Sequence, residues 1–231
     1  MKAMILAAGQ GKRMRPLTDT TAKALLQVSE RSLIEHIILS LVNAGISDLV
    51  INLHHFAELI ESHLGNGDRF GASIQYSHET ILLDTAGGIL NAMDLLGAEP
   101  FAVVNADIFT DYDFSGLKNL LPIAATDRSI LGHLVLVDNP AQHPGGDFAL
   151  SNTKAEGRCL LRLDSDKSLT WSGISVLRPE LFHGLAAGSS PLRDLFVPAI
   201  TADRMTGEHF KGSWTDVGTP ERLSSLIKAG R

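Results

Sequence analysis

Residues 1–16 of the chain read MKAMILAAGQGKRMRP, an apolar segment that runs into a glycine-containing turn and then into several cations. The run at 3–8 is continuous, apolar and bounded by glycine, which is typical of a buried strand. Gly9 and Gly11 allow a sharp turn in which backbone N–H groups can approach a ligand closely. The lysine and two arginines that follow would complete a site for a polyphosphate.

The rest of the first half alternates strands with helices. Ser32 and Glu35 form a capping-box pattern, which predicts a helix that ends at Gly45. Apolar runs at 49–53 and 101–105 predict buried strands, and a two-residue alternation predicts another at 73–77. This order predicts an α/β fold, a Rossmann-like and mostly parallel sheet flanked by helices, with ligands at the carboxyl ends of its strands.

The second half is less regular, and we expect it to form a small antiparallel extension over the ligand cleft. No linker, repeat or low-complexity segment interrupts the chain, so residues 1–231 are predicted to form one domain. The other predicted elements are strands at 132–137, 147–150, 159–163, 173–177 and 208–211, and helices at 56–64, 87–97, 179–185, 191–200 and from 219 onward.

Composition excludes several classes of protein. A net charge of −6 argues against a nucleic-acid binder held by phosphate contacts. Cys159 is the only cysteine, so there is no intramolecular disulfide or cysteine-based zinc site, and a reducing compartment is favoured. No run approaches 18 apolar residues, and the apolar start is too short for a signal peptide. We therefore expect a cytoplasmic protein without membrane contacts; the sequence indicates no oligomeric state.

Two common phosphate-binding motifs fail at defined positions of the glycine turn. A dinucleotide-binding fingerprint needs a third glycine where this chain has Met14. A Walker A loop needs serine or threonine directly after Gly-Lys, where this chain has Arg13. The turn is therefore neither of these two motifs, which leaves another kind of phosphate site or an ordinary strand-to-loop turn with solvated surface charges.

Residues 6–18, LAAGQGKRMRPLT, strongly resemble the signature of sugar-1-phosphate nucleotidylyltransferases. The resemblance implies that the loop amides and Arg13 hold the β- and γ-phosphates of a nucleoside triphosphate and that Lys23 contacts the α-phosphate. Arg13 and Lys23 are thereby the implied catalytic cations. The family usually flanks this lysine with prolines, where Ala22 and Ala24 stand here. The implied nucleotide-binding residues are Leu6, Ala8, Gly9, Gly11, Lys12, Arg13, Lys23 and Gly87.

Two distant acids resemble the metal ligands of the same family. Asp107 follows a predicted buried strand in an Asn-Ala-Asp segment, and Asp216 lies in Trp-Thr-Asp-Val-Gly-Thr, which resembles the family's Trp-x-Asp-x-Gly-Thr. Two converging carboxylates suit a partly hydrated Mg²⁺ that is also bound by substrate phosphates. Alternatively, Asp107 could be a helix cap or a surface residue, and Asp216 could cap the last helix.

Other segments resemble the family's base and sugar subsites. The segment 84–88, Asp-Thr-Ala-Gly-Gly, resembles the part that approaches the nucleobase; Thr85 could equally cap a helix, and the two interpretations are compatible. The resemblance implies a sugar-phosphate site that contains Asn105, Asp147, Gly173 and Trp214.

The resemblance implies transfer of a nucleotidyl group from a nucleoside triphosphate to a sugar 1-phosphate with release of pyrophosphate. The segments 111–114, 133–140 and 146–148 look most like N-acetylmuramate-1-phosphate uridylyltransferases of peptidoglycan recycling, which implies UTP as donor. A mannose-1-phosphate guanylyltransferase, a glucose-1-phosphate thymidylyltransferase and a non-catalytic nucleotide-sugar sensor remain alternatives. The four charged residues Arg13, Lys23, Asp107 and Asp216 argue against the sensor, which has no need of a metal at an α-phosphate.

Overall fold

The computed structural model describes residues 1–118, 120, 129–155, 157–163 and 168–228. Its main sheet has nine strands in the order β5-β4-β1-β6-β11-β8-β12-β10-β9. The strands are β1 (Lys2–Leu6), β4 (Asp48–Leu53), β5 (Ser73–His78), β6 (Phe101–Asn105), β8 (Gly132–Val137), β9 (Ala149–Ala155), β10 (Arg158–Arg162), β11 (Thr170–Leu177) and β12 (Met205–His209).

The first half of the chain forms the parallel part of this sheet. β5, β4, β1 and β6 run parallel to one another, with β1 between β4 and β6. β11 joins the second half to the first by pairing antiparallel with β6, and β8 pairs antiparallel with β11. β12 then runs parallel to β8, while β10 and β9 complete the edge as antiparallel strands. The expected fold class is confirmed, and the antiparallel strands extend the same sheet.

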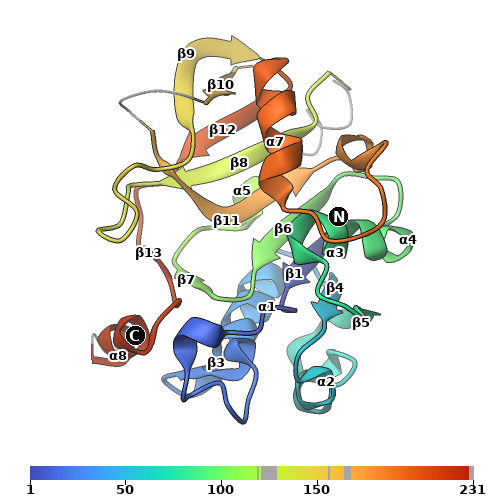
Figure 1. Cartoon of the computed structure of the whole chain (residues 1–231), viewed down its shortest axis with the longest axis vertical. Coiled ribbons are helices and arrows are strands. Elements are labelled where there is room, and N and C mark those ends of the chain that lie inside the picture. Colours follow the sequence, from blue (N-terminus) through green and yellow to red (C-terminus); the bar gives the residue numbers. More distant parts are fainter. Residues whose placement is uncertain (119, 121–128, 156, 164–167, 229–231) are drawn as a thin grey trace.

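Helices cover both faces of the sheet (Figure 1). Successive residues of β1 therefore enter opposite cores: Ala3 and Ile5 pack into one cluster and Met4 into the other. This two-sided burial explains why the first strand is a continuous apolar run. The helices are α1 (Leu33–Asn43), α2 (Ala57–Leu64), α3 (Asp84–Asn91), α4 (Met93–Leu96), α5 (Ser115–Lys118), α7 (Leu192–Thr201) and α8 (Pro220–Lys228).

Two short sheets and several 3-10 turns stand beside the main sheet. β7 (Ile108–Thr110) pairs with β13 (Trp214–Asp216), and β2 (Gln27–Val28) pairs with β3 (Arg31–Ser32). Figure 1 shows α8 below β13, beside the blue segment that holds β3. The 3-10 turns are η1 (Lys12–Met14), η2 (Lys23–Leu25), η3 (Asp68–Phe70) and η4 (Pro179–Phe182).

Several element boundaries differ from those expected. The helix predicted at 87–97 begins at Asp84 and is divided into α3 and α4 at Ala92. Thr85 does not cap it: its Oγ1 accepts the backbone N–H of Leu192 at 2.8 Å instead. β1 ends at Leu6 rather than at residue 8, because the next residues leave the strand to line a cavity. In the described residues, no helix is long and apolar enough to cross a membrane.

Candidate active site

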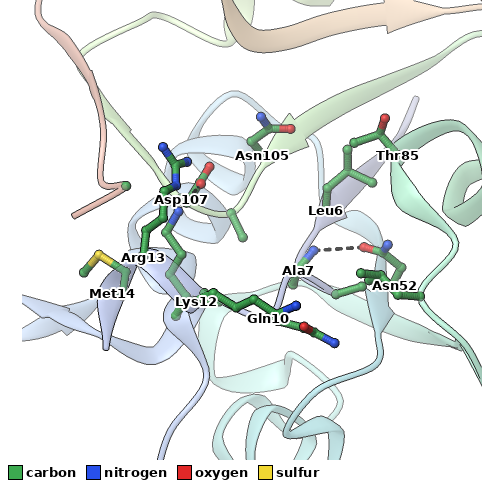
Figure 2. A pocket seen from close by; sticks show the side chains of 18 of the residues that line it. Leu6, Ala7, Gln10, Lys12, Arg13, Met14, Asn52, Thr85, Asn105 and Asp107 are labelled. Atoms are coloured by element: carbon green, nitrogen blue, oxygen red, sulfur yellow. Dashed lines mark hydrogen bonds and ion pairs between the residues drawn. The ribbon is translucent and has the colours of Figure 1, made fainter. Parts of the chain in front are cut away.

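A cavity of about 460 Å³ opens at the carboxyl ends of β1, β4 and β6. Residues of the glycine turn form one wall, and the first residues of α3 form another. Figure 2 shows Lys12 and Arg13 on the glycine-turn side and Thr85 on the α3 side. Parallel α/β sheets place ligands at this edge, so the cavity lies where the strand order predicts it.

The glycine turn is held by its own backbone. Gly11 has a φ of +61°, and its carbonyl accepts hydrogen bonds from the Met14 N–H at 2.8 Å and from Thr18 Oγ1 at 2.9 Å. A Cβ at Gly11 would lie 3.0 Å from the Thr18 side chain and 3.2 Å from Cβ of Lys23. Glycine is therefore needed both for the left-handed conformation and for the close approach of the Lys23 segment.

A buried hydrogen-bond network fixes the opposite end of the cavity. Asn52 Oδ1 accepts the N–H of Ala7 at 2.9 Å, the dashed line in Figure 2. Asn52 Nδ2 donates to Glu79 at 2.7 Å, and the other Glu79 oxygen accepts the N–H of Leu83 at 3.0 Å. The pair thus ties the end of β1 to the segment that precedes α3, so the two walls keep a fixed separation.

A second cavity of about 360 Å³ adjoins the first, and Arg13, Asn105 and Asp107 line both. Its far side consists of residues from β11, from β13 and from the segment 140–143. Gly173 has a φ of +81°, and a Cβ there would lie 2.6 Å from the Asn105 amide nitrogen. The Asn105 side chain therefore lies directly against bare backbone, which no other residue type at position 173 would allow.

Strand pairing brings two distant carboxylates to the second cavity. Asp216 is paired with Ile108 across β13 and β7, and the N–H of Val217 donates to the Asp107 carbonyl at 2.7 Å. Each carboxylate meets a cation: Asp107 forms an ion pair with Lys23, and Asp216 forms one with Arg222. The site therefore holds two partly buried acids and their internal counter-ions.

These two acids fit a magnesium ion. Their oxygens are the hard ligands that Mg²⁺ takes, and Mg²⁺ usually binds through one or two carboxylates together with water and substrate phosphates. Among the described residues no group of three histidine, cysteine or acidic side chains could hold a metal by itself. A metal here would therefore take its other ligands from water and from the substrates.

Sequence comparison identifies the chain as an enzyme. The family profile described as nucleotidyl transferase matches residues 2–143. An N-acetylmuramate alpha-1-phosphate uridylyltransferase from Neisseria meningitidis is 43% identical over 228 residues, which cover 96% of this chain and 95% of the relative. The chain belongs to the nucleotidyl transferase family. A second uridylyltransferase of the same name, from Caulobacter vibrioides, is 33% identical over 95% of this chain and 92% of its own length.

Other nucleotidyl transferases are more distant in sequence. A mannose-1-phosphate guanylyltransferase catalytic subunit from Dictyostelium discoideum is 28% identical over 97% of this chain and 63% of its own length. A putative glucose-1-phosphate thymidylyltransferase from Bacillus anthracis superposes with a TM-score of 0.85 over 100% of this chain and 95% of that one. Its 23% identity supports the shared fold alone.

The cavities of this nucleotidyl transferase collect most of the predicted site residues. All predicted nucleotide-binding residues except Gly87 line the first cavity, and all predicted sugar-phosphate residues except Asp147 line the second. Gly87 lies within α3, where a Cβ would meet the Gly188 carbonyl oxygen at 2.1 Å. Asp147 accepts the N–H of Trp171 at 2.9 Å. Gly87 and Asp147 therefore contact neighbouring backbone and do not line either cavity. The roles of all the predicted site residues stay predictions.

Sequence reasoning did not include several residues that line the cavities. Asn52 carried a usable signal, because an amide inside an apolar strand needs a polar partner. Several others lie inside segments that the sequence had singled out, but had no role assigned to them: Ala7, Gln10, Met14, Ala24, Asp84, Thr85, Ala106 and Gly218 at the first cavity and Pro140 at the second. The remaining residues gave no local signal: Leu82 at the first cavity, and Ile108, Gln142, His143, Thr170, Trp171, Ser172 and Arg222 at the second.

Proposed function

We propose that the chain transfers the uridylyl group of UTP to N-acetylmuramate 1-phosphate, giving the UDP-sugar and pyrophosphate. Relatives of that name at 43% and 33% identity, aligned over nearly the whole chain, support this choice of donor and acceptor. The product would serve cell-wall recycling in the cytoplasm.

The observation that carries the proposal is the junction of the two cavities. Arg13, Asn105 and Asp107 line both of them, so ligands that fill both would meet at these three side chains. The first cavity, beside the glycine turn, suits a nucleoside triphosphate whose phosphates face bare N–H groups and Lys12. The second suits the sugar 1-phosphate, with Trp171 and Trp214 available to pack against the ring.

The reaction requires no covalent intermediate with the protein. An oxygen of the sugar phosphate forms a bond to the α-phosphorus of UTP, and the bond from that phosphorus to the β-phosphate oxygen breaks. Pyrophosphate leaves with the electron pair. Arg13 and Lys23 would offset the charge that develops on the α-phosphate and on the leaving group, and the two cavities would hold the reactants in line.

In this proposal Asp107 and Asp216 hold Mg²⁺. When bound, the ion would supply positive charge next to the reacting phosphates. Lys23 and Arg222 form ion pairs with these carboxylates, so the side chains that balance the acids would also be close to the phosphates of bound substrates.

Guanylyl transfer to mannose 1-phosphate is the second candidate, supported by the Dictyostelium relative at 28% identity. It would use the same phosphate-binding residues and differ at the base and the sugar. The shared phosphate-binding residues do not distinguish the two candidates, so the test compares different nucleotides and different sugar 1-phosphates.

The test is pyrophosphate release in the presence of Mg²⁺ with UTP, GTP, dTTP and CTP, each combined with N-acetylmuramate, mannose and glucose 1-phosphates. We expect the largest kcat/KM for UTP with N-acetylmuramate 1-phosphate. A preference for GTP with mannose 1-phosphate would overturn the assignment of substrates. Absence of turnover with every pair would overturn the proposed activity itself.

A further inference from the structure

Arg222 stands on the first turn of α8 and folds back onto the acid six residues before it. Its Nη1 donates to Oδ1 of Asp216 and, at 3.3 Å, to the carbonyl of the same residue. Both side chains are mostly buried, with 19% and 27% of their surfaces exposed. Gln142 donates to the same Oδ1 at 3.0 Å, so this oxygen already accepts two hydrogen bonds.

The backbone between the two residues is shaped for this contact. A Cβ on Gly218 would lie 2.6 Å from Nη2 of Arg222 and 2.9 Å from Oδ2 of Asp216. Any larger residue at position 218 would therefore crowd both members of the ion pair. Gly218 has no left-handed φ, so close packing, and not backbone conformation, is what requires glycine here.

The helix that carries Arg222 is anchored to the glycine turn. Leu223 and Leu226 of α8 pack with Met14 and Val217 in a small buried cluster. Met14 directly follows Arg13, so the base of α8 and the phosphate-binding turn share one packed unit. Arg222 and Arg13 accordingly line the same second cavity, together with Asp107 and Asp216.

A divalent cation and Arg222 compete for Asp216. A cation that ligates Oδ1 would displace the guanidinium or the amide from that oxygen, and a cation that ligates Oδ2 would place its charge beside the guanidinium, so Arg222 opposes metal binding in either case. The guanidinium that is released stays in the cavity, where an anionic phosphate would be its natural new partner. Metal binding and phosphate binding are therefore linked through this side chain, and linkage of this kind acts equally in both directions.

We propose that Arg222 is a counter-ion switch: it neutralises Asp216 in the substrate-free enzyme and moves to the phosphate of the sugar 1-phosphate when a divalent cation binds. This inference rests on the proposed function. Its consequence is that the free enzyme binds the cation weakly, and that the acceptor phosphate strengthens cation binding by giving Arg222 another partner. Arg222 is thus a further residue of the acceptor site as well as a regulator of the metal site.

The test measures Mn²⁺ affinity by electron paramagnetic resonance, without nucleotide, in the absence and presence of N-acetylmuramate 1-phosphate. In the wild-type protein we expect the sugar phosphate to tighten Mn²⁺ binding by about fivefold or more. Arg222→Met should bind Mn²⁺ alone more tightly than the wild type, because the competing cation is gone, and should lose the enhancement by the sugar phosphate. Its KM for the sugar phosphate should rise.

Two further variants separate competition from a structural role. Arg222→Lys keeps a charge and should retain part of the enhancement. Arg162→Met removes a similar Arg–Asp contact, 2.6 Å to Asp203, away from both cavities and should change neither quantity.

Unchanged or weaker Mn²⁺ binding in Arg222→Met would overturn the inference, because Arg222 would then merely orient Asp216. That result would leave the proposed function standing wherever the wild-type protein still releases pyrophosphate with Mg²⁺. Conversely, a wild-type protein inactive with every substrate pair refutes the proposed function even if the Mn²⁺ affinities shift as expected.

Discussion

Asp107 joins the two halves of the cleft, because it lines both cavities and forms an ion pair with Lys23. In the proposed function its carboxylate would bind the metal, whereas its backbone carbonyl accepts the Val217 N–H and so holds β13 beside β7. The two roles belong to different atoms. A substitution of the side chain can therefore separate chemistry from structure.

Asp107→Asn should lower Mg²⁺-dependent kcat by about 100-fold or more, in line with the loss of one electrostatic group at a reacting centre. The amide oxygen can still accept from Lys23, so the melting temperature and the circular dichroism spectrum should match the wild type. Asp113→Asn, on the exposed segment after β7, is the matched control and should leave kcat unchanged. Full activity of Asp107→Asn would show that the metal assignment is wrong.

At the scale of elements, the capping box predicted at Ser32 and Glu35 is present at the start of α1. Glu35 accepts the Ser32 N–H at 2.7 Å and the Arg69 guanidinium at 2.9 Å, and His63 lies 3.3 Å away. Burial by itself raises the pKa of Glu35, but the hydrogen bonds from Ser32 and the charge of His63 outweigh it and leave the pKa below its ordinary value of 4.5. The cap thus also fastens α1 to the segment before β5.

Glu35→Gln should lower the free energy of unfolding at pH 7 by about 1–3 kcal/mol, because hydrogen bonds to a buried charge are lost. A carboxyl with a lowered folded-state pKa stabilises the protein above its unfolded-state pKa, and the contribution disappears as pH falls through the folded-state pKa. The difference between variant and wild type should therefore shrink below about pH 4. Urea unfolding at several pH values measures it; a difference independent of pH would contradict this account.

At the scale of the whole molecule, one continuous sheet joins the two halves of the chain. β6 from the first half pairs with β11 from the second over four residue pairs, and helices from both halves pack into the same cluster. A boundary between independent units would have to cut this ladder. We therefore expect the chain to unfold cooperatively, as the one-domain organisation predicted from the sequence requires.

Thermal unfolding should show a single transition by calorimetry, with matching calorimetric and van't Hoff enthalpies. Tryptophan fluorescence should follow the same curve as far-ultraviolet circular dichroism, although Trp171 and Trp214 both lie in the second half. An earlier fluorescence transition would show that the second half unfolds as a separate unit. Samples without nucleotide avoid stabilisation by bound ligand.

Local sequence patterns were enough to predict the structural features that depend on residues close together in the chain. The apolar run of β1, the turn at Gly11 and the capping box of α1 follow from strand burial, left-handed backbone and helix-end hydrogen bonding, all of which act within a few residues. The position of the glycine turn at the end of β1 was predictable for the same reason. The alternative that Thr85 caps a helix is wrong, because Thr85 instead accepts a hydrogen bond from Leu192, which lies 107 residues away.

Tertiary structure alone decided which distant residues share the cleft. β7 and β13 are three residues long, too short for a pattern to reveal that they pair, yet their pairing sets Asp216 beside Asp107. Arg222 reaches Asp216 within a short local segment, but the packing of α8 against Met14 is what brings this ion pair to the glycine turn. Local sequence was enough to predict the first strand, the glycine turn and the types of charged side chain near them. Long-range strand pairing and packing bring these groups together in one site. Such contacts leave no periodic pattern along the chain, so the sequence could not predict them.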